Sequence, residues 1–71
     1  MSVSLGMRAL LLIRLGARQG QWVGVETLAE THRITQQTVR EGLQELLDEG
    51  YVRCRTGADG MIEAAMSAVG V

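Results

Sequence analysis

The segment from residue 28 to residue 60 constrains the fold most, because helix signals give way there to strand signals. Within it, residues 36–49 carry an apolar stripe at helical spacing, made of Val39, Leu43, Leu46 and Leu47. Thr35 is a good N-cap, and Ile34 before it can form a hydrophobic staple with the first turn. Gly50 is suited to the left-handed position of a Schellman cap. The pattern predicts an amphipathic helix between residues 36 and 49.

Signals on either side of this helix complete a motif. Gly24 can cap a helix over residues 25–31, and residues 31–34 then form a turn of helix-turn-helix length. Residues 51–55 alternate, with Val52 and Cys54 on one face and Tyr51, Arg53 and Arg55 on the other. A Gly-rich cluster at 56–60 predicts a turn, so that residues 51–65 form a hairpin, or wing. The chain is therefore predicted to be a mainly α fold with a small β-hairpin (α+β), a three-helix winged helix-turn-helix in one domain, 1–71.

The N-terminal helix, predicted over residues 5–18, has more apolar surface than one core can cover. Leu10 to Ile13 are four consecutive aliphatic residues, which cannot all face one core on a 3.6-residue period. The tail, residues 66–71, is also apolar. Both features predict a homodimer through this helix and the tail. The alternative is that the tail packs along the same helix in its own chain.

The polar face of the predicted helix at 36–49 indicates nucleic acid. It carries Gln36, Gln37, Thr38, Arg40 and Gln44, and Gln and Arg are the side chains that pair bidentately with adenine and guanine. We expect this face to lie in the major groove of double-stranded DNA, with Arg33 on a phosphate and Arg55 and the wing tip near the minor groove. The predicted DNA-binding residues are Arg33, Thr35, Gln36, Gln37, Thr38, Arg40, Gln44, Arg55 and Gly57.

The charge distribution permits this prediction without requiring it. The net charge of the 71 residues is −1, whereas phosphate neutralisation supplies most non-specific DNA affinity. Residues 1–40, however, hold five arginines against two glutamates. Four acids, Glu41, Glu45, Asp48 and Glu49, follow in the later part of the recognition helix, which we expect to point away from DNA.

These motifs resemble the DNA-binding domain of GntR-type transcriptional repressors, without an effector domain. The match runs over about half of the chain, most specifically through Thr38-Val39-Arg40-Glu41-Gly42-Leu43 and Glu49-Gly50-Tyr51-Val52. The resemblance implies a winged helix and carries DNA contact to Thr38 and Arg40. The chain departs from the family pattern at Arg33, where the turn usually has Gly, and at Gln36, where Arg is preferred.

Other functional classes find little support in the sequence. One His and one Cys, with no Ser/His/Asp arrangement and no cluster at metal-ligand spacing, predict no catalytic residues, no metal and no cofactor. We expect Cys54 to have a buried apolar role and Trp22 to anchor the core, with base stacking by Trp22 as the alternative. Neither a signal peptide nor a transmembrane run is recognisable, so we expect a cytoplasmic, nucleoid-associated protein without a membrane partner.

Two functions therefore remain open. The first is a small sequence-specific DNA-binding protein, a transcriptional repressor or mobile-element accessory factor. The alternative is a winged-helix module that binds a host or partner protein without DNA contact. Low net basicity and the acidic residue at the wing tip, Asp59, favour this alternative.

Overall fold

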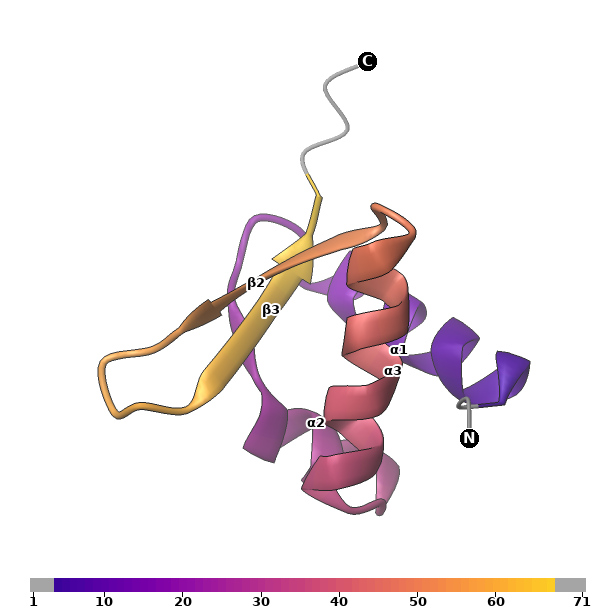
Figure 1. Cartoon of the computed structure of the whole chain (residues 1–71), viewed down its shortest axis with the longest axis horizontal. Coiled ribbons are helices and arrows are strands. Elements are labelled where there is room, and N and C mark those ends of the chain that lie inside the picture. The colour runs from indigo at the N-terminus through magenta and orange to yellow at the C-terminus, as the bar shows by residue number, and fades with distance from the viewer. Residues whose placement is uncertain (1–3, 68–71) are drawn as a thin grey trace.

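A computed structural model describes residues 4–67 as three helices and a small antiparallel sheet (Figure 1). In chain order the elements are α1 (Leu5–Ala17), β1 (Val23–Gly24), α2 (Val25–His32), α3 (Gln36–Asp48), β2 (Val52–Thr56) and β3 (Ile62–Met66). The β2–β3 hairpin projects away from the helices, as Figure 1 shows. This arrangement confirms the predicted α+β class and the winged helix-turn-helix layout. The helix ends lie within a residue of their predicted positions.

The residues predicted to begin and end α3, Thr35 and Gly50, flank the helix in the structure. The Thr35 side chain accepts a hydrogen bond from the Thr38 backbone N–H at 3.1 Å, as an N-cap does. At the other end Gly50 has φ +83°, and its N–H donates to the Leu47 carbonyl at 3.0 Å. The Tyr51 N–H donates to the Leu46 carbonyl at 2.9 Å, which completes the Schellman pattern. These bonds fix where the helix ends and the hairpin begins.

The sheet has the strand order β1-β3-β2, so that β3 pairs with both neighbours. Arg53 lies opposite Ala65 and Arg55 opposite Glu63 in the hairpin, while β1 adds a third strand with Val23 opposite Ala64. Because side chains alternate along a strand, one face of the sheet packs on the helices and the other is turned away from them. We call the second face, which carries Arg53, Arg55, Glu63 and Ala65, the outer face.

The core lies between the three helices and the inner face of the sheet. Its buried members are Leu11, Leu15, Val23, Val25, Leu28, Ala29, Val39, Leu43, Leu46, Val52 and Ala64. The prediction that Leu47 belongs to this stripe is wrong, because 38% of Leu47 is exposed. The buried arc of α3 instead includes Gly42, which shifts its centre away from Leu47.

In α1 only part of the aliphatic run reaches the core. Leu11 is fully buried, whereas Leu10 is 46% and Ile13 68% exposed. The expected surplus of apolar surface on this helix is therefore present. The predicted tail starts too early, because Met66 pairs with Val52 inside β3 and packs against the core. Residues 68–71, the rest of that tail, lie outside the described residues.

Among residues 4–67 no helix has the length and apolar character needed to cross a membrane.

Candidate nucleic-acid interface

The turn that leads into α3 is fixed by an arginine in an unusual conformation. Arg33 has φ 56° and ψ 47°, in the left-handed region that residues other than Gly, Asn and Asp rarely adopt. Its N–H donates to the Glu30 carbonyl at 3.3 Å, and the Ile34 N–H donates to the Ala29 carbonyl at 3.0 Å. The Arg33 side chain is exposed and forms no hydrogen bond or ion pair with any other described residue. It is therefore available to a phosphate, the role predicted for it.

The two threonines predicted to contact DNA are already engaged with each other. The Thr35 Oγ1 and Thr38 Oγ1 atoms lie 2.9 Å apart, and Thr35 also caps the helix. Thr38 is half-buried. Both hydroxyls therefore stabilise the start of α3, although Thr35 itself remains exposed to solvent.

The other polar residues of α3 divide between different flanks of the helix. At about 100° per residue, Gln36, Arg40 and Leu47 fall on the flank beside the hairpin. Gln37, Glu41, Gln44 and Asp48 fall on the flank opposite the core, and Thr38, Glu45 and Glu49 on the flank toward α1. A single DNA groove can meet the first two flanks together. Thr38 lies on the far side from Arg40.

Arg40 lies at the edge of a groove between α3 and the hairpin. The groove has a volume of about 270 Å³ and is lined by Arg40, Leu43, Gln44, Leu47, Cys54 and Ile62. Arg40 is exposed and, among residues 4–67, has no hydrogen-bond or ion-pair partner. Leu47 and Ile62 are 38% and 36% exposed, so the floor of the groove is apolar. The arrangement offers one unpaired cation above a short apolar surface, which we call the α3–hairpin groove.

The only cysteine lies in this groove. Cys54 is half-buried, and burial raises the pKa of its thiol. The predicted buried apolar role is therefore only partly realised. A raised pKa keeps the thiol protonated at neutral pH, where it behaves as a small apolar group.

Two of the three glutamines of α3 are held by carboxylates one turn further along the helix. The Gln37 amide donates to Glu41 at 3.5 Å, and the Gln44 amide donates to Asp48 at 2.9 Å. The bond to a carboxylate uses one of the two N–H groups of each amide and leaves the other N–H and the amide oxygen for a base edge. Glu41 and Asp48 lie on the flank opposite the core, together with the two glutamines that they hold.

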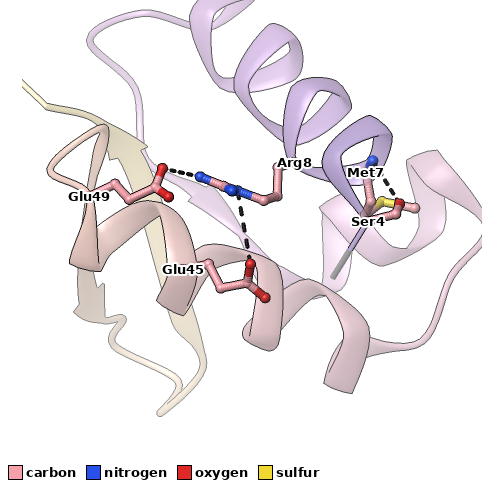
Figure 2. A network of polar contacts seen from close by, with 5 residues as sticks. All are labelled: Ser4, Met7, Arg8, Glu45 and Glu49. Atoms are coloured by element: carbon pink, nitrogen blue, oxygen red, sulfur yellow. Dashed lines mark hydrogen bonds and ion pairs between the residues drawn. The ribbon is translucent and has the colours of Figure 1, made fainter. Parts of the chain in front are cut away.

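The side chains of the other two acids of α3, Glu45 and Glu49, point toward α1. Arg8 of α1 reaches across to both of them (Figure 2): it donates a hydrogen bond to Glu49, and its Nε lies 4.0 Å from Glu45. The Arg8 side chain is only 19% exposed. Two of the four late acids are therefore bound on the side of α3 remote from the α3–hairpin groove.

Arg55 and Trp22 lie on the outer face of the sheet. The Arg55 guanidinium lies 4.1 Å and the Arg53 guanidinium 5.1 Å from the centre of the Trp22 ring, and Arg55 Nε donates to Glu63 at 2.9 Å. The prediction of Trp22 as a core anchor is wrong, because the ring is half-buried beside these arginines and outside the core cluster. Extending the register of β1 by one residue places Trp22 opposite Ala65. This explains why Ala65 is only 2% exposed on the outer face.

The hairpin tip is built around Gly57. A Cβ at this position would lie 3.0 Å from Glu63 Cδ and 3.3 Å from Asp59 Oδ1, so the absence of a side chain makes room for two acids. The Gly57 N–H donates to the Met61 carbonyl at 2.7 Å, and Asp59 accepts from the Met61 N–H. A side chain at position 57 would therefore require the Glu63 and Asp59 carboxylates to shift slightly, whether or not DNA approaches the tip.

Of the nine predicted residues, Arg40 and Gln44 line the α3–hairpin groove, and Gln36 lies on the same flank as Arg40. Gln37 is exposed nearby, Thr38 is half-buried on the flank toward α1, and Arg33 and Thr35 lie in the turn before α3. Arg55 and Gly57 belong to the hairpin, with Arg55 on its outer face. Leu47, Cys54 and Ile62 were not predicted as part of the site. The alternation of residues 51–55 already put Cys54 on one face with Val52, but a strand pattern alone cannot say that α3 stops short of covering Cys54.

Among residues 4–67, no group of three or more His, Cys, Asp or Glu side chains could hold a metal ion. Comparisons with protein-family models and with curated proteins find no match for the chain. The residues and their geometry therefore carry the functional conclusion.

Proposed function

We propose that the chain is a small sequence-specific DNA-binding protein, a transcriptional repressor or mobile-element accessory factor, that reads the major groove with α3. The observation that carries the proposal is Arg40, an exposed and unpaired arginine on the hairpin flank of the second helix of a helix-turn-helix. Bidentate pairing of Arg with guanine is the commonest specific contact in protein–DNA complexes. DNA binding of this kind would associate the protein with the nucleoid.

The N-terminal half of α3 supports the same function electrostatically. Its first turn leaves backbone N–H groups without intrahelical partners, and the positive end of the helix dipole lies there. Arg33 precedes this turn and Arg40 follows it, and neither is neutralised by a described carboxylate. The resemblance of residues 38–43 to GntR-type repressors is consistent with this orientation, and membership of that family is part of the proposal.

The proposal is tested by selecting bound duplexes from a random pool and measuring the affinity of two variants for the selected site. Arg40→Ala should cost about 1–3 kcal/mol of binding and relax the preference at one base pair. Arg53→Ala is the matched control, since it removes the same charge from the outer face of the sheet. Equal losses in both variants would mean that charge alone attracts DNA, and unchanged binding by Arg40→Ala would remove α3 from the interface.

A second candidate function is favoured by the floor of the α3–hairpin groove. Leu47, Cys54 and Ile62 form an apolar surface beside Arg40, and the two outward glutamines of α3 are held by carboxylates. Apolar side chains with one cation at the edge suit a short apolar peptide with an acidic residue better than they suit a phosphate backbone. The second candidate is therefore a winged-helix module that binds a partner protein through this groove.

A displayed peptide library distinguishes this second candidate from DNA binding. Enrichment of apolar, acidic peptides that is lost in Leu47→Ser and kept in Arg53→Ala would support peptide binding in the groove. Enrichment that survives Leu47→Ser would place the peptide elsewhere and count against it.

A further inference from the structure

The most exposed apolar surface of the described chain lies on α1. Six large apolar side chains are exposed, and three of them, Leu5, Leu10 and Ile13, belong to this helix. Leu5 is 77% and Ile13 68% exposed, the two largest values of the six. The remaining solvent-facing positions of α1 are Gly6, Ala9, Gly16 and Ala17. At 100° per residue these seven positions span an arc of about 140° that carries no charge and no polar side chain, and the half-buried Arg14 lies at its edge.

This arc continues into a groove between α1, the end of α3 and the start of the hairpin. The groove has a volume of about 400 Å³ and is lined by Leu5, Arg8, Ala9, Leu12, Leu46, Glu49 and Tyr51. Tyr51, which is 50% exposed, is the fourth of the six exposed large apolar side chains to lie on this surface. Leu5 and Ala9 belong to both surfaces, so the arc and the groove form one patch, which we call the α1 patch.

The charges that line the groove of the α1 patch are already compensated within the chain. Arg8 and Glu49 are the charged residues that line the groove, and they are bonded to each other, with Glu45 also beside Arg8 (Figure 2). A charged partner would have to compete with this ion pair. An uncharged apolar partner would leave it in place, so the patch favours an occupant that is itself apolar and neutral.

We infer that the α1 patch binds a second copy of the chain in a two-fold dimer. An isologous interface needs a surface that is complementary to itself, and the α1 patch has both parts, protruding side chains at Leu5 and Ile13 and a groove beside them. In the dimer each copy places its protruding side chains against the groove of the other. The small residues of the arc allow the two α1 helices to approach closely. Met66, which was expected to contribute to the interface, is excluded because it packs on the core of its own chain.

The dimer does not depend on DNA binding, but it would bring two α3 helices into one particle. DNA-binding proteins of the helix-turn-helix class commonly bind two half-sites in this way. The interface lies on α1, whereas the proposed reading surface lies on the opposite flank of α3, so one chain can use both at once.

The oligomeric state of the full chain tests the inference. Sedimentation equilibrium from low to high micromolar concentration should show a dimer for the wild type. Ile13→Glu and Leu5→Glu each put a charge into the α1 patch and should raise the dimer dissociation constant about 100-fold or more. Leu47→Glu is the matched control, because it charges an exposed leucine on another helix and should leave the dimer intact. Thermal melts followed by circular dichroism establish that each variant is folded.

A wild type that stays monomeric at high micromolar concentration would overturn the inference and leave the α1 patch to another occupant, such as the C-terminal residues of the same chain. A dimer that persists in both folded α1 variants, or that is lost in Leu47→Glu, would move the interface away from the α1 patch. A folded Ile13→Glu monomer that still prefers the selected DNA site would support the inference and the proposed function separately.

Discussion

Replacement of Arg33 by glycine should stabilise the fold, although it removes a side chain. Arg33 occupies the left-handed region with φ 56°, which costs an L-residue roughly 1–2 kcal/mol because Cβ crowds the following carbonyl. Glycine lacks that penalty, but it gains about 0.5–1 kcal/mol of extra backbone entropy in the unfolded state. The Arg33 side chain makes no hydrogen bond or ion pair with the other described residues, so little else is lost. The net gain in the free energy of unfolding is therefore about 0.5–1 kcal/mol.

Thermal and urea unfolding of Arg33→Gly and Arg33→Ala measure this gain. For a domain of this size the glycine variant should melt roughly 2–8 °C above the wild type. The alanine variant keeps Cβ and its strain, so it should melt at or slightly below the wild type. Both variants lose the same guanidinium, so both should lose the same DNA affinity if Arg33 contacts a phosphate. A glycine variant no more stable than the alanine variant would refute the strained conformation at this turn.

Two further predictions concern the core and the thiol. Leu43→Ala should lower the free energy of unfolding in urea by about 2–5 kcal/mol, because Leu43 is 1% exposed. Leu47→Ala should lower it by less than about 1 kcal/mol, because Leu47 is 38% exposed. Equal losses would show that the buried arc of α3 is misplaced. Burial raises the pKa of the Cys54 thiol above its ordinary value of 9.0. The folded state therefore holds the thiol proton more tightly than the unfolded state does. The stability that this gives is complete below the pKa of the unfolded thiol and is lost as pH rises through the pKa of the folded thiol. Between about pH 8 and about pH 10 the wild type should therefore lose more unfolding free energy than Cys54→Ala, and parallel curves would contradict burial of the thiol.

Features set by a few neighbouring residues were predictable from the sequence. The cap at Thr35, the left-handed Gly50 and the alternation of Val52 and Cys54 each depend on geometry within about six residues. Their hydrogen bonds follow the prediction closely, and of the two inward residues Val52 is buried and Cys54 half-buried. The three-helix fold with a hairpin follows from the order of these local signals.

Features set by distant contacts were not predictable in the same way. Trp22 lies on the outer face because β1 pairs with β3, about forty residues later, and pairing register cannot be read from residues 21–24 alone. Leu47 lies at the border of a helical stripe, where its exposure depends on how far the hairpin covers α3. The division of the acids of α3 between Arg8 and the glutamines likewise depends on where α1 crosses.

For the candidate interface, the sequence identified the residue types but could not identify their partners. Positions 40 and 55 are both arginine, and both lie in polar segments of the sequence. The structure leaves Arg40 unpaired beside a groove, and it places Arg55 against Trp22 and Glu63. The two arginines are therefore not equivalent candidates for DNA contact.

The ratio of affinities for a selected duplex and for a scrambled duplex of the same length tests the central claim most directly. Fluorescence anisotropy at two or more salt concentrations gives both constants for the wild type. Sequence reading by α3 predicts a preference of about 10³-fold or more that persists at physiological salt, while the affinity for both duplexes falls as salt rises. Equal affinity for the two duplexes, or no binding to either at low salt, would contradict the claim that this chain reads DNA.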